Sequence, residues 1–372
     1  MVKVFIWKII LMTVLKKNDS VVVIDYIKNS DLTSNVKEIV PQDKLVVLDF
    51  EDTENLQSLS YNELNYTDDM SKNNKMRAIY YKAKSSLELL NCLNDKELSN
   101  MAKIYFSSMA TIVYSVNQFA SLKDIVNCLT DCDTRMDYIN RVPKDLKEII
   151  DDEINTVLRL DTVLSSRKSV EEILSTTCLL EQFMKTNFMF KNTSENNINF
   201  ENCFDEGKVI VIKINDDISD NKNIKDMLTL FFVTKVHTAC KNRAVKLDGN
   251  QNRVHLVIDD AHTMSNTLKQ LENIIPQTRV VNLKPVLAVQ NLSQLPNSTL
   301  QTMNISGFNF MFLSGLDEKA YKILESDLSP YTFDDVKNIE KYHSLNLVLN
   351  NDGRREVFLT KLPVVLEVCN IK

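Results

Sequence analysis

The segment Val254 to His262, VHLVIDDAH, most constrains how this chain folds, because a continuous apolar run ends there in two adjacent carboxylates. Such a run suits a strand of a parallel sheet that is covered on both faces. The carboxyl ends of parallel strands meet the loops that form the sites of α/β proteins. Asp259 and Asp260 are therefore candidate site residues at the tip of a buried strand. The alternative is that the two acids cap a helix that starts near Thr263.

The distribution of glycine limits what can accompany this strand. A phosphate-binding loop of the form G-x-x-x-x-G-K-[ST] needs glycine, because only glycine lets several backbone N–H groups converge on a phosphate. The five glycines are Gly207, Gly249, Gly307, Gly315 and Gly353, and none of them begins such a match. The strand and its acids are typical of a nucleotide-driven motor, but the sequence contains no loop of this form.

Length and composition indicate an ordinary globular protein. With 372 residues, of which 44% are hydrophobic, the chain can bury a sizeable core and is predicted to hold one large domain plus an insertion. The formal net charge of −6 argues against nucleic-acid binding over the whole surface but is compatible with a local basic patch. The seven cysteines are odd in number, which favours reduced thiols in a cytoplasmic protein. No histidine lies near Cys128 and Cys132, so packing is expected there rather than metal binding.

The apolar segment Val4 to Leu15, VFIWKIILMTVL, is too short to span a membrane, which takes about 20 apolar residues. We interpret it as a buried helix of the fold. A short interfacial anchor and a signal peptide are the alternatives, although no small-residue cleavage site follows before Lys16 and Lys17.

Further β-branched runs predict the other strands. The first two end in aspartates, Asp25 and Asp49, where a site residue or the start of a turn are both compatible with the pattern. Because helical stretches separate several runs, a doubly wound and mostly parallel sheet is predicted. The predicted strands, besides that of Asp259, are 21–25, 45–50, 208–214, 285–290, 308–313, 344–349 and 356–360.

Between residues 70 and 192 the pattern changes to helical periodicity without a convincing strand. Apolar residues recur there at helix spacing, for example Tyr80, Ala83, Leu87, Leu90 and Leu93. The polar stretch KNTSENNIN at 191–199 then forms a linker. The chain is therefore divided into a first part of an α/β core, residues 1–66, an all-helical insertion, 67–200, and a second part of the core, 201–372.

Two more residues are candidates for the same site. Gln290 ends the strand PVLAVQ, next to the predicted acid-bearing strand, and could orient a γ-phosphate or the attacking water. Arg279, in QTRVV, could reach a phosphate across a subunit interface, since guanidinium suits bidentate contact with phosphate. The alternative for Arg279 is a solvated surface position. Because parallel strands end at one side of a sheet, Asp25, Asp49, Asp259, Asp260 and Gln290 are expected along one edge, with Asp259 and Asp260 at its centre.

The order of these segments carries a resemblance. VVVIDYIKNSDL, PQDKLVVLDF, LSYNEL, a helical insert, FDEGKVIVIKI, VHLVIDDAHTM, PVLAVQNLSQL and FMFLSGLDEKAYKIL together resemble the TraG-like type IV coupling proteins of conjugation and secretion systems. These proteins belong to the wider FtsK and HerA family of DNA-pumping ATPases. The similarity runs from about residue 20 to residue 362, and its specificity lies in the order and spacing of the segments.

The resemblance implies a RecA-like P-loop NTPase fold that binds ATP and magnesium. Asp259 would hold magnesium through water, Asp260 would act as the base with Gln290 and Arg279 beside it, and Asp25 would lie on the cofactor side. It also implies a hexameric ring that transfers single-stranded DNA, with a relaxase and secretion-channel proteins as partners, in the cytoplasm or at the inner face of the cell membrane as part of a secretion complex. In the family the phosphate-binding loop precedes the helix equivalent to Val4–Leu15.

Without that loop, the chain is predicted to be a truncated or degenerate coupling ATPase. The alternative is a non-hydrolysing structural or adaptor subunit that retains the fold for assembly. If DNA is bound, lysines and arginines should contact its phosphates. The densest local group is Lys75, Arg77, Lys82 and Lys84, for which a solvated helix face is the alternative.

Overall fold

A computed structural model gives the structure of this chain. It describes residues 17–25, 32–50, 57–93, 96–160, 162–163, 167–176, 178, 197–214, 222–246, 251–313, 315–350 and 352–362. The segment Val4–Leu15, predicted from the sequence to be a buried helix, lies outside the described residues.

Five parallel strands form the central sheet. These are β1 (Ser20–Asp25), β2 (Leu45–Asp49), β3 (Val209–Lys213), β4 (Val254–Ile258) and β5 (Leu283–Leu287). Their order across the sheet is β2-β3-β1-β4-β5, and every neighbouring pair is parallel. The predicted α/β class and mostly parallel sheet are thus confirmed, and each of these five strands lies within two or three residues of its predicted bounds.

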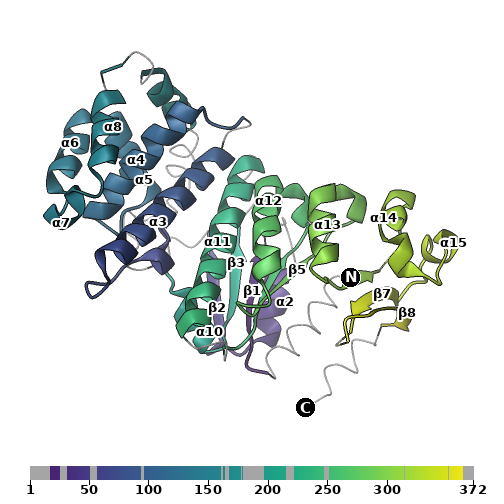
Figure 1. Cartoon of the computed structure of the whole chain (residues 1–372). Helices are drawn as coiled ribbons and strands as arrows, with labels where there is room; N and C mark the ends of the chain where they lie inside the picture. Colours follow the sequence, from purple (N-terminus) through teal and green to yellow (C-terminus); the bar gives the residue numbers. More distant parts are fainter. Residues whose placement is uncertain are drawn as a thin grey trace.

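Helices cover both faces of this sheet, so the core has three layers (Figure 1). Alternate side chains of β1 enter two separate clusters: Val21 and Val23 pack with α2 (Leu32–Ile39) on one face. Val22 and Ile24 belong to the large cluster on the opposite face. This alternation explains why β1 reads as a continuous apolar run, since both of its faces are buried.

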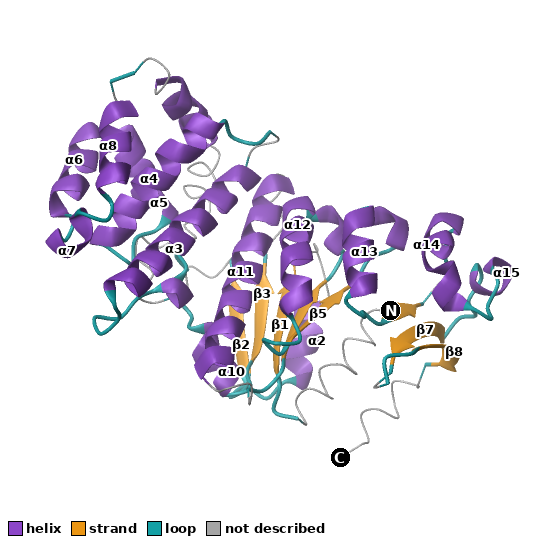
Figure 2. Ribbon diagram, in the orientation of Figure 1, coloured by secondary structure: helices purple, strands orange, loops and turns teal. Residues whose placement is uncertain are grey.

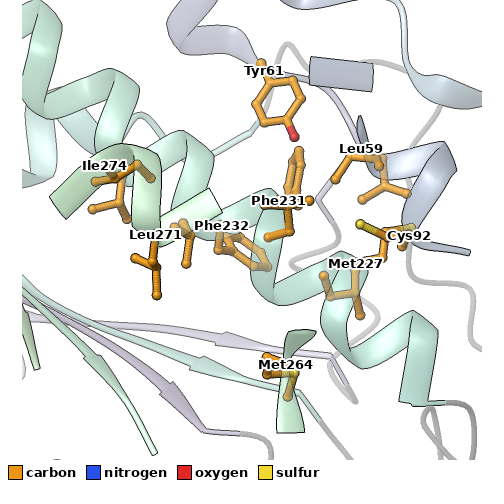
Figure 3. Packing of buried hydrophobic residues seen from close by; sticks show 14 of the residues in the cluster. Leu59, Tyr61, Cys92, Met227, Phe231, Phe232, Met264, Leu271 and Ile274 are labelled. Carbon is orange, nitrogen blue, oxygen red and sulfur yellow. The ribbon is translucent and has the colours of Figure 1, made fainter. Parts of the chain in front are cut away.

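The large cluster surrounds α11 (Lys222–Lys246), the longest helix of the core, with α10 (Phe200–Asp205) and α12 (Ser265–Ile274) beside it. Phe231 and Phe232 of α11 meet edge to face with ring centroids 5.1 Å apart. Figure 3 shows them between residues of α12 and residues of the helical segment. The hydrophobic core therefore continues from the sheet through α11 into the helical part of the chain.

Residues 72–160 of the described chain are helical, apart from short connections, and contain no strand. They form a lobe at one end of the molecule (Figure 1). Its helix α3 packs against α11. Tyr80 of α3, part of the predicted apolar stripe, is exposed and donates a hydrogen bond to Glu153 Oε1 (2.8 Å). The helices are α3 (Lys72–Cys92), α4 (Asn100–Val116), α5 (Leu122–Thr130), α6 (Cys132–Arg141), α7 (Lys144–Lys147) and α8 (Asp151–Leu160).

The last three strands do not join the parallel sheet, contrary to the expectation of one doubly wound sheet. They are β6 (Phe310–Phe312), β7 (His343–Leu349) and β8 (Arg355–Lys361), and they form a separate antiparallel sheet in that order. The connection between β7 and β8 has five residues, which suits an antiparallel pair, whereas parallel neighbours need a crossover of a dozen or more.

Helix α13 (Asn297–Ile305) packs against α12 of the core, whereas α14 (Glu318–Leu328) contacts β8 of the second sheet and α15 (Phe333–Val336) lies near it. The loop before α14 passes so close to the chain after α15 that a Cβ at Gly315 would lie 1.5 Å from the carbonyl oxygen of Lys337. Only glycine fits at this position without a backbone shift.

No helix in the described ranges is both long and apolar enough to cross a membrane. The same residues contain no cluster of three or more His, Cys, Asp or Glu side chains placed to hold a metal ion. Cys128 is buried and Cys132 is exposed, both as free thiols.

Candidate functional site

The two acids of the sequence motif follow β4 directly and form a tight turn. Asp259 is buried, and its Oδ1 accepts a hydrogen bond from the backbone N–H of Asp260 (2.9 Å). Asp260 has a left-handed backbone with φ 44° and ψ 39°. Its carbonyl oxygen accepts hydrogen bonds from the N–H and the hydroxyl of Thr263, both at 3.1 Å. The turn thus leads into the 3-10 helix η3 (Ala261–Thr263) with both carboxylates at the end of the strand.

The neighbouring strand fixes this turn. The N–H of Ala261 donates to the carbonyl of Ala288 (3.0 Å), and the N–H of Ala288 donates to the carbonyl of Ile258 (3.0 Å). Since Ala288 directly follows β5, these bonds hold the acid turn beside the end of β5. His262 lies in η3, half-buried, and its Nδ1 has no hydrogen-bond partner in the described structure.

A row of polar side chains follows the carboxyl ends of the strands. Asp25 and Asp49 both lie opposite Lys213 in the register, and Lys213 Nζ is 3.3 Å from Asp49 Oδ2. Because Ile24 pairs with Ile258, Asp25 lies level with Asp259. All five strands of the central sheet are parallel, so these residues and Gln290 lie along the same edge of that sheet, as the sequence predicted.

One detail of that prediction is wrong. Asp259 and Asp260 were expected at the centre of the row, but the central strand is β1, and β4 lies between β1 and the edge strand β5. The centre of the sheet edge therefore carries Asp25. The acid pair lies one strand away, between Asp25 and the end of β5.

Asp25 has a structural role in the described chain. Its Oδ2 accepts hydrogen bonds from the backbone N–H (3.2 Å) and the hydroxyl (2.6 Å) of Thr33, in the first turn of α2. A carboxylate at the amino end of a helix satisfies N–H groups that have no partner within the helix. The contact with a cofactor that the family resemblance implied for Asp25 remains a prediction.

Gln290 and Arg279 lie at opposite ends of β5. Gln290 follows the strand by three residues and is exposed at the carboxyl edge. Arg279 precedes the strand and is exposed at the amino edge, where its guanidinium lies beside Gly307. Within one chain, Arg279 is therefore not part of the site with Asp259 and Asp260. Its contact with a phosphate across a subunit interface remains a prediction.

Sequence reasoning missed Asp226, a buried residue of α11 that supports the acid turn. Its Oδ1 accepts from Thr267 N (2.9 Å) and Thr267 Oγ1 (2.8 Å), and its Oδ2 accepts from Asn266 N (2.7 Å). These groups form the first turn of α12, which begins directly after η3. Asp226 thus joins α11 to the helix that follows the two acids. Nothing marked it in the sequence, because its partners lie about forty residues further along the chain.

The chemistry of this edge suits a hard cation more than a bare phosphate. Carboxylates such as those of Asp259 and Asp260 are the oxygen ligands that magnesium takes, with water completing the shell. The described residues around them supply no glycine-rich turn whose N–H groups could converge on a phosphate. The magnesium side of a nucleotide site is therefore compatible with these residues, and the phosphate side is not.

Comparison with known proteins places this arrangement in a fold class. No family model and no curated protein matches the chain. Its fold is similar to that of the bacterial conjugative coupling protein TrwBΔN70, with a TM-score of 0.56 and 15% identity over 100% of this chain and 77% of that chain. It is also similar to VirB4 of Thermoanaerobacter pseudethanolicus, with a TM-score of 0.57 and 13% identity over 95% of this chain and 84% of that chain.

TrwB in complex with the non-hydrolysable ATP analogue ADPNP is similar as well, with a TM-score of 0.53 and 14% identity over 97% of this chain and 75% of that chain. These similarities show that the chain has the RecA-like NTPase fold of TrwB and VirB4. At such low identity they establish the fold alone.

Proposed function

We propose that this chain is a coupling-type ATPase subunit of a type IV secretion or conjugation system. The observation that carries the proposal is the acid turn after β4, Asp259 and Asp260, in a fold shared with a coupling protein that binds an ATP analogue. Asp259 would hold magnesium through water, and Asp260 would act as the base toward the attacking water. Gln290, across the end of β5, would orient that water.

In this proposal the core consists of residues 1–66 and 201–372, and residues 67–200 form the helical lobe. Such subunits would assemble into a hexameric ring and move single-stranded DNA or a nucleoprotein, with a relaxase and channel proteins as partners. In such a ring Arg279 of one subunit would reach the site of the next, since within its own chain it lies at the opposite edge of the sheet from Asp259 and Asp260.

The second candidate is a non-hydrolysing structural or adaptor subunit. The absence of a G-x-x-x-x-G-K-[ST] match from the sequence favours it. Magnesium and a base alone cannot supply the charge stabilisation that phosphoryl transfer requires, because backbone donors and a lysine normally surround the β- and γ-phosphates.

The first prediction is that the purified chain hydrolyses ATP feebly or not at all. The assay is steady-state phosphate release with and without magnesium, accompanied by binding of a fluorescent ATP analogue. Asp260→Asn serves as the active-site variant, and Asp334→Asn, on exposed α15, serves as its control. Robust turnover that disappears in Asp260→Asn alone would contradict this prediction and would show that other residues form the phosphate clamp.

The second prediction concerns DNA, and the structure corrects the group of cations expected to bind it. Lys82 is buried, with its Nζ donating to Asn65 Oδ1 (2.6 Å), so it cannot contact a DNA strand. Arg77 and Lys84, on the same helix, are exposed. Phosphate contacts dominate non-specific binding. Binding of an oligo-dT by the chain should therefore be weak and steeply salt-dependent.

The double charge reversal Arg77→Glu with Lys84→Glu should weaken oligo-dT binding by roughly tenfold at low salt, through lost phosphate contacts. Lys147→Glu, an exposed lysine elsewhere on the lobe, is the control and should change binding little. No detectable binding at low salt, or equal binding by the double variant, would favour the structural or adaptor subunit.

A further inference from the structure

A groove with a volume of about 1230 Å³ lies between the edge strand β5 of the parallel sheet and β6 of the antiparallel sheet. Figure 2 shows β5 at the end of the parallel sheet that faces β7 and β8. None of the described residues that line the groove is an aspartate or a glutamate, although the chain has 50 of these residues and a net charge of −6. The lining does include Arg253, Arg279 and Lys284, which we call the basic cluster. The groove is therefore basic in an acidic protein.

Two members of the basic cluster are placed by the amino ends of neighbouring strands. Lys284, the second residue of β5, lies opposite His255 of β4 in the register. Arg253 directly precedes β4, and its carbonyl accepts a hydrogen bond from the N–H of Ser20 (2.9 Å). Burial lowers the pKa of His255, Asp19 opposes this shift, and the charges of Arg253 and Lys284 add to it. Both cations thus act on the same place at the amino edge of the sheet.

Arg279 reaches the same place from the turn before β5. Its guanidinium lies against Gly307, which has a φ of 75°, and a Cβ at that position would lie 3.0 Å from Arg279 Nη2 and 2.6 Å from Leu349 Cδ2. Glycine therefore provides the room that the guanidinium occupies. Burial is the main cause that lowers the pKa of Lys284, and the charges of Arg253 and Arg279 lower it further. The three cations are close enough to repel one another.

No carboxylate among the described residues balances this charge. The side chains of the basic cluster form no ion pair or hydrogen bond within the described part of the chain. The acid nearby is Asp19, whose Oδ1 accepts from the backbone N–H of Arg253 (3.1 Å) and whose Oδ2 lies 3.7 Å from His255 Nε2. By contrast, Arg243 of α11 lies 2.7 Å from Asp205 Oδ1. Unbalanced charge of this kind costs stability, and proteins retain such costs mainly at functional sites.

The chemistry of the cluster matches phosphate. Guanidinium groups form bidentate contacts with phosphate oxygens, and an ammonium group adds a point charge. Two guanidinium groups and one ammonium group suit a group with two or more negative charges better than a single carboxylate. The walls of the groove beyond the cluster are apolar, and they include Pro285 and Leu287 of β5 and Met311 of β6, which is 51% exposed. A matching ligand therefore combines a phosphate group with an apolar body.

We propose that the basic cluster binds the phosphate monoester or diphosphate group of a ligand whose apolar body lies along β5. The same chemistry occurs in a lipid head group and in a soluble phosphorylated molecule. This site is separate from the acid turn: Arg253 and Asp259 are six positions apart along β4. At about 3.3 Å per residue, roughly 20 Å separate the two backbones. The proposal goes beyond the proposed function, because binding at this edge requires neither magnesium nor Asp260.

The first test uses the full chain and inorganic pyrophosphate, which supplies the anion alone, in isothermal titration calorimetry with EDTA present. Binding should be saturable. Lys284→Gln and Arg253→Gln should each weaken it at least roughly tenfold through the loss of a charge-assisted contact. Lys269→Gln, on the exposed side of α12, is the matched control and should leave the affinity unchanged.

Two further measurements separate a binding site from a structural role of these cations. Lys284→Gln removes a repelled charge, so its urea denaturation midpoint should be higher than that of the unaltered chain. A lower midpoint would mean that Lys284 stabilises the fold and would overturn the proposal. Bound pyrophosphate should also raise the pKa of His255, followed by NMR of its ring and assigned with His255→Gln, because a nearby anion favours the protonated form. An unchanged titration of His255 would place the anion elsewhere.

Flotation with phosphatidylcholine vesicles, with and without phosphatidic acid, distinguishes the two sources of the phosphate group. Retention of the chain that requires phosphatidic acid and decreases in Lys284→Gln would identify a lipid head group. Pyrophosphate binding without retention on either kind of vesicle would identify a soluble phosphorylated ligand. Either result supports the site.

Four results would overturn it. These are no binding of pyrophosphate, an equal decrease in Lys269→Gln, loss of binding in Asp260→Asn, and binding of oligo-dT that depends on Lys284 when pyrophosphate does not bind. The third would place the anion at the acid turn, and the fourth would show contact with a polynucleotide backbone. The affinity should also be independent of chain concentration. An affinity that rose with it would place the cluster at a subunit interface and contradict a site within one chain.

Discussion

Asp260 combines a candidate catalytic side chain with an unfavourable backbone conformation. Its φ of 44° lies in the left-handed region, which few residues other than glycine adopt and which aspartate tolerates better than most because its short side chain can hydrogen-bond locally. The conformation is held by contacts on both sides, from Asp260 N–H to Asp259 and from Thr263 to the Asp260 carbonyl. Strain of this kind persists where surrounding structure fixes it, and it concentrates at functional sites.

The third prediction separates the backbone of Asp260 from its carboxylate. Asp260→Gly and Asp260→Ala both remove the carboxylate, but only glycine adopts the left-handed region without a steric cost. The glycine variant should therefore be more stable than the alanine variant by about 1 kcal/mol in the free energy of unfolding, measured by urea denaturation. Equal stability of the two variants would mean that the turn relaxes when the side chain is removed.

Among the elements, α12 shows how the fold fixes the position of the acid turn. The helix begins within a few residues of Asp260, and its first N–H groups are satisfied by Asp226 of α11 instead of a residue of its own N-terminus. Asp226 is buried, so water cannot replace its carboxylate as the acceptor for these N–H groups. The position of the turn thus depends on the contact between two helices.

The fourth prediction is that Asp226→Asn lowers the free energy of unfolding by about 1–3 kcal/mol. An amide offers one acceptor oxygen in place of two, and its NH₂ group faces the N–H donors of α12. Asp131→Asn is a matched control, since Asp131 caps α6 at an exposed site by accepting from Thr134 N (2.8 Å), and it should cost less. If urea denaturation showed the same decrease in the free energy of unfolding for both variants, burial of the Asp226 cap would not add to its stabilising effect.

The elements differ in how well the sequence predicts them. Parallel strands such as β1 and β4 are continuous apolar runs bounded by polar residues, and that pattern locates them to within a few residues. The pattern does not reveal which strands pair, so the separate sheet of β6 to β8 was not foreseen. Long-range polar contacts leave no local pattern either. Asp226 and Lys82 both lie within helical stretches, and their partners are distant in sequence or loop residues.

For the molecule as a whole, the important boundary is that between the helical lobe and the core. Buried polar groups lie on its core side: Lys235 Nζ of α11 lies 2.7 Å from Glu63 Oε2 in the 3-10 helix η1 (Asn62–Leu64), and Asn242 donates to the Glu63 carbonyl (2.8 Å). Burial raises the pKa of Glu63 and lowers that of Lys235, in both cases against the opposing effect of the pair itself. Such a pair fixes one relative placement of its elements, because separating either group from its partner leaves a buried charge.

Lys82 of α3 extends this network on the lobe side and gives it a pH dependence. Its Nζ donates to Asn65 Oδ1 and to the carbonyl of Gln118, and it lies 5.2 Å from the centre of the Tyr114 ring. Burial is the main cause that lowers the pKa of Lys82 from its ordinary value of 10.5 to about 7, with a further contribution from the charge of Lys235. Between these two values the unfolded chain binds more protons than the folded chain.

The fifth prediction follows from that difference in bound protons: the contribution of Lys82 makes the free energy of unfolding rise with pH from about pH 7 toward pH 10. One pH unit corresponds to at most about 1.4 kcal/mol for a single proton, so the gain from pH 7 to pH 9 is at most about 2.7 kcal/mol. Lys82→Met removes the titrating group, and the variant should show a correspondingly smaller rise in urea denaturation across this range. Lys84→Met, two residues along and exposed, should keep the full rise. If the two variants depended on pH alike, Lys82 would stay protonated in the folded chain, and the boundary between lobe and core would carry two buried ammonium groups for one carboxylate.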